Sequence, residues 1–277
     1  MYTLNLDPNF TFPDKIHYKS FIFNGGEIHF ALRDNLTLNT KEEVLITHRV
    51  KNSNNIMEIA IANDALKRFG FKKRSLLMPY APYARQDRVA NLGESLSVKV
   101  FADIINSCDF EDVIIWDAHS DVITALLNNC TNKKIDEIVY NIIGKNDVKN
   151  IVFPDAGAMK KYKYIYLNHL NVISCTKERN TVTGELSDFN LNGTLKEGNT
   201  LIIDDICDGG RTFIEISKLI RNLKYRSSSS NLYLYTTHGI YANGIEVLLE
   251  QFDKLFCTNS FKDINNRFVE QYKLNNV

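Results

Sequence analysis

The chain has 277 residues, 44% of them apolar, which is enough for a packed core and excludes a disordered or fibrous protein. Its 33 lysines and arginines balance 33 aspartates and glutamates, so it lacks the broad positive field that attracts nucleic acid, and we expect no nucleic acid partner. The first residues do not show the basic segment followed by an apolar stretch that is typical of a signal peptide, and no apolar run approaches the roughly 18 residues of a membrane span. The five cysteines form neither a Cys-x-x-Cys pair nor a zinc-binding spacing. We therefore expect a cytoplasmic protein with reduced thiols and no membrane partner.

Short β-branched runs alternate with helical patterns along most of the chain. In the first half, the pattern predicts strands at 44–47, 75–78 and 113–116 and helices at 55–69 and 97–106. Gly70 is expected to end the first of these helices. In the second half, it predicts strands at 151–153, 172–176, 201–204 and 232–236 and helices near 156–162 and 211–223. This alternation is typical of an α/β fold with parallel sheets covered by helices on both faces.

Two apolar strands end in a histidine, with Trp-Asp-Ala-His at 116–119 and Tyr-Thr-Thr-His at 235–238. The spacing suits two similar α/β domains, and chance recurrence of a short strand end explains it equally well. The polar and charged segment 133–145 is expected to contain the crossing from one domain to the other.

The densest chemical signal lies at 201–212, Leu-Ile-Ile-Asp-Asp-Ile-Cys-Asp-Gly-Gly-Arg-Thr. An apolar strand ends in Asp204 and Asp205, and the chain then passes through Gly209 and Gly210 into a predicted helix. Backbone N–H groups and a helix N-terminus bind phosphate, whereas carboxylates accept hydrogen bonds from sugar hydroxyls. The segment therefore predicts a ligand that carries both a cis-diol and a phosphate.

This loop resembles the phosphoribosyl-diphosphate-binding motif shared by type I phosphoribosyltransferases and ribose-phosphate diphosphokinases. Five further segments match the second group in order: Pro-Tyr-Ala-Arg-Gln-Asp-Arg at 82–88, Asp-Ala-His at 117–119, Pro-Asp-Ala-Gly at 154–157, Lys-Glu-Arg at 177–179 and Thr-His-Gly at 237–239. Over roughly residues 20–260 the chain is similar to the ribose-phosphate diphosphokinase (phosphoribosyl diphosphate synthetase) family, with a divergent substrate loop.

The resemblance implies two phosphoribosyltransferase-like domains, at 1–137 and 138–277, each a mostly parallel sheet flanked by helices. It also implies an enzyme that transfers the diphosphate of ATP to the anomeric hydroxyl of ribose 5-phosphate, in nucleotide biosynthesis. Its partners would be ATP and a ribose phosphate, its cofactor Mg²⁺, and its assembly a homo-oligomer.

The same resemblance assigns roles to individual residues. Those that would contact ATP lie in the first half: Phe23, Glu27, Arg85, Gln86, Asp87 and His119. Those that would bind the ribose phosphate follow the strand at 201–204: Asp204, Asp205, Asp208, Gly209, Gly210, Arg211 and Thr212. His119 and Asp155 would help to hold Mg²⁺, which takes few protein ligands. Lys177 and Arg179 would be catalytic, in a polar loop at 177–198 able to close over the site.

Three features depart from the family pattern. Gly25 stands where a polar side chain would face adenine, and the segment 89–94 lacks the basic residues on which an allosteric site would depend. In the substrate loop, a hydroxyl side chain is lost and Arg211 is gained. Arginine suits a second phosphate through forked, charge-assisted hydrogen bonds.

Several functions therefore stay open. Ribose 5-phosphate is the leading acceptor, and a 5′-substituted ribose phosphate such as ADP-ribose, which would serve NAD metabolism, is the alternative. A type I phosphoribosyltransferase fits less well because it would not need the segment 82–88. A non-catalytic subunit should lack Lys177, Arg179 or the Mg²⁺ ligands, and all are present.

Overall fold

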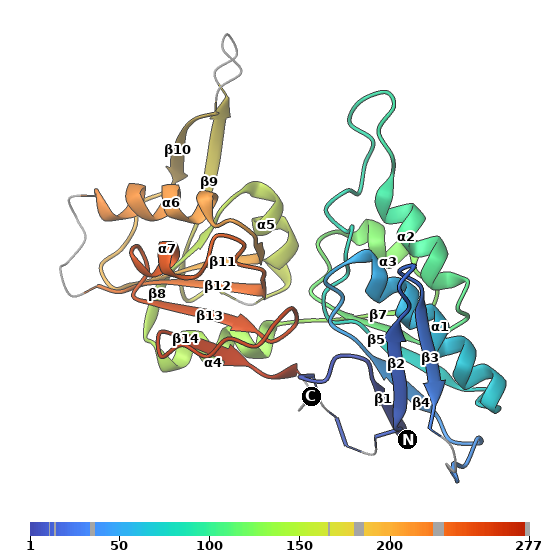
Figure 1. Cartoon of the computed structure of the whole chain (residues 1–277). Coiled ribbons are helices and arrows are strands. Elements are labelled where there is room, and N and C mark those ends of the chain that lie inside the picture. Colours follow the sequence, from blue (N-terminus) through green and yellow to red (C-terminus); the bar gives the residue numbers. More distant parts are fainter. Residues whose placement is uncertain are drawn as a thin grey trace. The chain divides into compact units, whose positions relative to one another are not determined.

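The computed structural model describes all residues except 11, 14, 34–36, 166, 180–185, 224–229 and 275–277, and within 177–179 and 186–189 it describes the backbone alone. The described chain forms two compact units, Met1–Lys133 with Leu274, and Lys134–Lys273 (Figure 1). This boundary differs from the predicted one between residues 137 and 138, which would cut α4 (Asp136–Lys145), a helix that lies whole in the second unit.

The first unit is built around a five-stranded parallel sheet with the order β1-β4-β5-β6-β7. These strands are β1 (Tyr2–Asn5), β4 (Val44–Thr47), β5 (Arg74–Leu77), β6 (Val113–Trp116) and β7 (Cys130–Lys133). The helices are α1 (Ser53–Phe69), α2 (Ser97–Asn106) and α3 (Asp121–Leu126). A separate antiparallel hairpin joins β2 (Tyr18–Ile22) to β3 (Ile28–Leu32).

Helix α1 shows how the local sequence sets the limits of an element. The Asn52 side chain accepts a hydrogen bond from the Asn55 N–H at the N-terminus, and Gly70 ends the helix in the left-handed conformation, with φ at 114°. Its apolar side, which includes Ile59 and Leu66, is fully buried in the core of the first unit. The predicted helix and its glycine cap are confirmed.

The second unit contains a seven-stranded sheet with the order β10-β9-β8-β11-β12-β13-β14. Its strands are β8 (Val148–Phe153), β9 (Asn171–Arg179), β10 (Leu186–Asn192), β11 (Asn199–Cys207), β12 (Leu232–Gly239), β13 (Lys254–Thr258) and β14 (Val269–Tyr272). All neighbours are parallel except β10, which runs antiparallel to β9. The helices besides α4 are α5 (Ala156–Lys161), the 3₁₀ turn η1 (Tyr162–Tyr164), α6 (Arg211–Arg221) and α7 (Glu246–Leu249).

Strand β11 lies at the centre of the second unit. Its consecutive residues Leu201, Ile202 and Ile203 are all fully buried, which requires cover on both faces of the sheet because successive side chains point to opposite sides. Ile202 packs in one core with residues of α6, and α5 packs against β8 and β11. Parallel sheets flanked by helices are therefore present as predicted.

The two sheets share a five-strand order. The order β1-β4-β5-β6-β7 of the first unit corresponds to β9-β8-β11-β12-β13 of the second, and every neighbouring pair in both is parallel. The two similar strand ends, with His119 after β6 and His238 in β12, occupy equivalent places in this order. The two similar strand ends in the sequence therefore reflect two sheets with the same strand order.

The segment 177–198 differs from the predicted polar loop. Strand β9 continues to Arg179 and pairs antiparallel with β10, so the catalytic candidates Lys177 and Arg179 lie on a two-stranded ribbon that projects from its sheet (Figure 1). All five cysteines are free thiols, as predicted. Among the described residues, no helix combines the length and the apolar character that crossing a bilayer requires.

Candidate active site

The carboxyl end of β11 places two acidic side chains on opposite faces of the sheet. Asp204 is partly exposed and lies on the same face as Ile202, which packs with α6, whereas Asp205 is buried and faces α5. The Asp205 N–H donates to Asp204 Oδ1 at 2.9 Å, and Lys161 Nζ lies 3.0 Å from Asp205 Oδ2. Asp204 therefore accepts a hydrogen bond from the backbone, and Asp205 is paired with a lysine.

This end of the sheet carries an excess of negative charge. Burial raises the pKa of Asp204 well above its usual range, and the charge of Asp205 and, more weakly, that of Asp155 act in the same direction. A site of this kind favours groups that donate hydrogen bonds or carry positive charge. Sugar hydroxyls and a divalent cation both meet that requirement.

The loop that follows forms the start of α6. Gly210 precedes the helix in the left-handed conformation, with φ at 83°, and a Cβ atom there would lie 2.9 Å from Leu248 Cδ2. The loop is fixed from its other side, where Asn243 Nδ2 donates to the Gly209 carbonyl at 3.1 Å and the Ala242 N–H donates to the Asp208 carbonyl at 3.0 Å. The two glycines therefore meet protein atoms and give no additional room for a ligand.

The first N–H groups of α6 suit an anion. N–H groups in the first turn of a helix have no partner within the helix, and the helix dipole adds partial positive charge there. Arg211, the first residue of α6, is exposed, and Thr212 is partly buried. The structure thus places the start of α6, whose first N–H groups suit an anion, shortly after the two carboxylates of β11. That these groups bind a ribose phosphate stays a prediction.

Asp155 occupies the end of the neighbouring strand β8. It caps α5 by accepting a hydrogen bond from the Ala158 N–H at 2.8 Å, and it remains exposed. Among the residues that the structure describes, no group of three or more His, Cys, Asp or Glu side chains is arranged to hold a metal ion. Mg²⁺ would suit such a sparse arrangement, since it keeps several waters and takes one or two protein carboxylates with phosphate oxygens.

Two further segments of the second unit that match the family pattern are 237–239, which contains His238, and 177–179, which contains Lys177 and Arg179. His238 is buried, and its Nδ1 lies 2.9 Å from Ser260 Oγ, so this histidine serves as a hydrogen-bonding residue of the core. The side chains of Lys177 and Arg179 lie outside the described part of the chain. Their backbone belongs to β9, the strand next to β8.

In the first unit, Phe23 and Glu27 close the β2–β3 hairpin. The Phe23 N–H donates to the Glu27 carbonyl at 2.8 Å, and the half-exposed Phe23 ring lies 4.9 Å from Phe21 and 5.9 Å from His29 between ring centres. A Cβ atom on Gly25 would lie 2.6 Å from Glu27 Oε2. The Glu27 carboxylate thus occupies the space that a side chain at position 25 would need.

The segment 82–88 forms a tight turn after β5. Tyr83 has a positive φ of 63°, the Gln86 N–H donates to its carbonyl at 2.9 Å, and its hydroxyl lies 2.9 Å from Ser53 Oγ. Ala84 is buried, which leaves the side chains of Arg85 and Gln86 exposed and that of Asp87 partly exposed. A turn held by these hydrogen bonds, with exposed polar groups, is a suitable arrangement for contacting a ligand.

The third segment predicted to contact ATP, 117–119, lies at the end of β6, the next strand of the same sheet. Asp117 has a φ of 45°, and its N–H donates to the Lys133 carbonyl at 2.9 Å. The Trp116 N–H donates to the Pro79 carbonyl at 3.0 Å, which ties the end of β6 to the loop that leads into 82–88. His119 is partly buried. Arg85, Gln86 and His119 thus belong to the same edge of one sheet.

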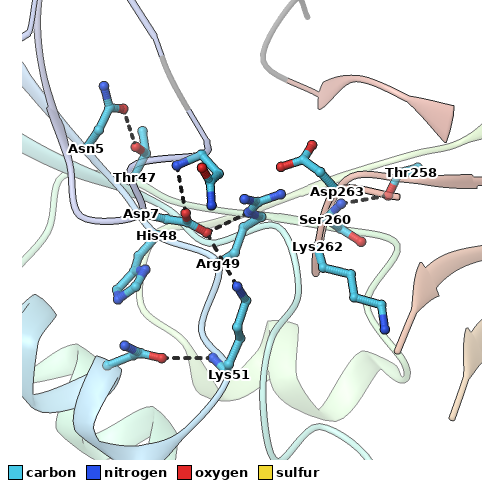
Figure 2. A network of polar contacts seen from close by, with 12 residues as sticks. Asn5, Asp7, Thr47, His48, Arg49, Lys51, Thr258, Ser260, Lys262 and Asp263 are labelled. Carbon is cyan, nitrogen blue, oxygen red and sulfur yellow. Dashed lines mark hydrogen bonds and ion pairs between the residues drawn. The ribbon is translucent and has the colours of Figure 1, made fainter. Parts of the chain in front are cut away.

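The sequence prediction missed a buried polar network at the ends of β1 and β4. Arg49 Nε donates to Asp7 Oδ2 at 2.7 Å, Lys51 Nζ lies 3.9 Å from the same oxygen, and Thr47 donates to Asn5 Oδ1 at 2.6 Å (Figure 2). Burial alone would raise the pKa of Asp7, but the hydrogen bond and charge of Arg49 hold that pKa below its usual range. The basic run His-Arg-Val-Lys at 48–51, directly after a predicted strand, is the signal that the sequence offers.

The sequence prediction also missed Lys161. It is the second of two adjacent lysines at the end of α5, and the sequence alone does not distinguish it from Lys160, which is exposed. Their different roles arise from the packing of α5 against β11.

The comparisons with protein families and with curated relatives point to the same family. Residues 15–108 match the N-terminal domain of ribose phosphate pyrophosphokinase. The ribose-phosphate pyrophosphokinase of Mycoplasma genitalium is 28% identical over 269 residues, which cover 91% of this chain and 77% of the relative. The enzyme of the same name from Pyrococcus furiosus is 29% identical over 74% of this chain and 73% of the relative.

One solved structure is similar over nearly the whole chain. It is the phosphoribosylpyrophosphate synthetase from Mycobacterium smegmatis, with a TM-score of 0.78, 21% identity, and coverage of 95% of this chain and 87% of that one. At this level of identity, the similarity supports the fold, with its two α/β units.

Proposed function

Because the chain belongs to the ribose-phosphate pyrophosphokinase family, we propose that it transfers the diphosphate of ATP to the anomeric hydroxyl of ribose 5-phosphate. The observation that carries the proposal is the end of β11, where Asp204 and Asp205 are followed by a short loop into the start of α6. A diol-binding pair beside an anion-binding helix start fits a ribose phosphate.

The acceptor is bound by two kinds of contact. The side chains of Asp204 and Asp205 accept hydrogen bonds from the 2- and 3-hydroxyls, and a carboxylate oxygen is a stronger acceptor than a neutral amide oxygen. The 5-phosphate meets the backbone N–H groups between Asp208 and Thr212 and the positive end of the α6 dipole. This orientation fixes the anomeric hydroxyl for attack.

The first unit supplies the residues for ATP: Phe23, Glu27, Arg85, Gln86, Asp87 and His119. The half-exposed Phe23 ring offers a stacking surface for the base, and the exposed Arg85 offers charge-assisted hydrogen bonds to phosphate. The exposure of these groups on turns closed by backbone hydrogen bonds supports the assignment.

In the reaction, the anomeric oxygen attacks the β-phosphorus of ATP, the bond from that phosphorus to the α,β-bridging oxygen breaks, and AMP leaves while the hydroxyl proton is released. Lys177 and Arg179 would donate positive charge to the diphosphate as it moves. Asp155, a hard oxygen donor, and His119, a softer nitrogen donor, would hold Mg²⁺, which when bound neutralises charge on the transferring group. A homo-oligomer in the cytoplasm stays a prediction.

A second acceptor class is favoured by one observation, the exposed guanidinium of Arg211 at the start of α6. A 5′-diphosphate, as in ADP-ribose, would present a second phosphate group to it. The neighbouring glycines do not add to this case, because Asn243 and Leu248 already occupy the space beside them.

The test offers ATP and Mg²⁺ with either acceptor and identifies the products by mass, using wild type, Arg211→Ala and the control Lys218→Ala, an exposed position later on α6. We expect diphosphate transfer to ribose 5-phosphate with little effect of Arg211→Ala. If the acceptor carries a diphosphate, Arg211→Ala should lower kcat/KM for it by about ten- to a hundredfold. Wild type that transfers diphosphate to neither acceptor would refute the proposed function.

A further inference from the structure

The ion pair between Lys161 and Asp205 has no role in the function argued so far. We propose that Lys161 is a positioning residue for the ribose-phosphate site, acting on the sugar through Asp205. The proposal rests on the proposed function of that site and deepens it.

The geometry places one lysine of α5 against the end of β11. Helix α5 begins after its cap, Asp155, at the end of β8, and its six residues span about 9 Å. It packs against both β8 and β11, so its last residue, Lys161, reaches Asp205 Oδ2 at 3.0 Å. The ammonium group also lies 5.2 Å from the centre of the Tyr162 ring, which restricts its position further.

Burial makes this pair different from a surface ion pair. The Asp205 side chain is 6% exposed and that of Lys161 is 20% exposed. Solvent therefore screens the pair weakly, and removing one partner takes a close, opposite charge away from the other. Surface pairs of the same unit, such as Lys149 with Asp147, are at least half exposed and are worth little.

The ion pair between Lys161 and Asp205 matters because a second carboxylate, that of Asp204, lies next to it. Asp204 and Asp205 are consecutive, and their negative charges lie close enough to raise the pKa of Asp204. Lys161 compensates the charge of Asp205 and lies 3.0 Å from its Oδ2, which restricts the rotamer of the Asp205 carboxylate. Without that charge, the Asp205 carboxylate would lose one of the contacts that restrict its rotamer, and repulsion between the two carboxylates would grow. The sugar would then lose an ordered acceptor, whereas the ATP residues of the first unit would be unaffected.

The chain offers a matched control in Lys160. It is the preceding residue of the same helix, it is exposed, and among the residues that the structure describes it forms no ion pair. Adjacent helical residues point in different directions, so a change at Lys160 alters the charge of α5 without touching Asp205.

The experiment compares Lys161→Gln, Lys161→Arg and Lys160→Gln by steady-state kinetics and by calorimetric binding of ribose 5-phosphate. We expect Lys161→Gln to raise the KM for the sugar phosphate about tenfold or more, with the KM for ATP changed by less than about twofold. Lys161→Arg should restore most of the sugar affinity, and Lys160→Gln should match wild type. An unchanged KM for the sugar in Lys161→Gln would overturn the proposal.

A double-mutant cycle separates positioning from direct contact. If Lys161 acts through Asp205, Lys161→Gln should add no further loss of sugar affinity in an Asp205→Asn background. If the two losses are additive, Lys161 contacts the ligand itself and the proposal is wrong. Wild type that lacks diphosphate transfer would instead refute the proposed function, so the two failures are distinguishable.

Discussion

Replacing Gly210 by alanine tests whether the loop between β11 and α6 is built as described. Gly210 has a φ of 83°, and a Cβ atom there would lie 2.9 Å from Leu248 Cδ2. The left-handed conformation costs an L-residue about 1–2 kcal/mol, and forcing an extra methyl group against a buried side chain costs about 1–3 kcal/mol. We therefore expect Gly210→Ala to destabilise the second unit by about 2–5 kcal/mol.

The assay is urea unfolding followed by circular dichroism, with Gly144→Ala as the control. Gly144 lies exposed in the last turn of α4, and among the described residues no atom beyond its chain neighbours and the nearby backbone of its own helix lies within 4 Å of its Cβ position. The same substitution there should stabilise the protein by about 0.4–1 kcal/mol, because alanine is the better helix former. Equal effects at the two positions would refute the reasoning.

A double variant separates the two parts of the cost at Gly210. Leu248 is fully buried, so Leu248→Ala alone should cost about 2–5 kcal/mol. It also removes the atom that the new methyl group of Gly210→Ala would meet, so the double variant should be less destabilised than the sum of the single variants by about 1–3 kcal/mol. If the destabilisation in the double variant equals the sum of the two single effects, contact with Leu248 is not the reason why position 210 requires glycine.

Three further predictions concern catalysis, acid stability and ATP binding. Lys177→Ala and Arg179→Ala should each lower kcat by about 10²-fold with little change in the KM for the sugar phosphate, and unchanged turnover in both would remove them from the mechanism. Asp7→Asn should destabilise the protein by about 1.5–3 kcal/mol at pH 7, because the buried Arg49 guanidinium loses a charged acceptor that lies 2.7 Å from its Nε. Since the pKa of Asp7 is lowered in the folded state, the stability that its charge adds is present above a pH of about 4 and is lost as the pH falls further, so the urea midpoints of wild type and variant should converge in acid. Gly25→Ala should displace the flexible end of Glu27 and raise the KM for ATP by a few fold, about 1 kcal/mol or less, while the urea midpoint stays within error.

Buried, strongly patterned elements could be predicted from the sequence. Strand β4 and helix α2 have the bounds that their patterns predicted, because each carries a continuous apolar side and a clear stop. The edge elements could not be predicted in this way. Strand β14, Val-Glu-Gln-Tyr, and the ribbon strand β10 are edge strands that pair on one side only. Edge strands carry polar residues, so the sequence patterns of these two strands resemble those of loops.

The candidate site shows the same division. Asp204, Asp205 and the start of α6 follow one another in the chain, so the sequence alone could bring them together. The ion pair of Lys161 joins residues 44 positions apart, and the choice of Lys161 over Lys160 depends on the rotation of α5 about its axis. Such a choice is decided by tertiary packing, which local sequence patterns do not contain.

The central claim is that a diphosphate moves as one group, and ATP labelled at the β-phosphorus tests it most directly. With ribose 5-phosphate and Mg²⁺, the label should appear in the sugar product, with one AMP released for each product molecule. Label that remains in ADP, with a single phosphate on the sugar, would contradict the account.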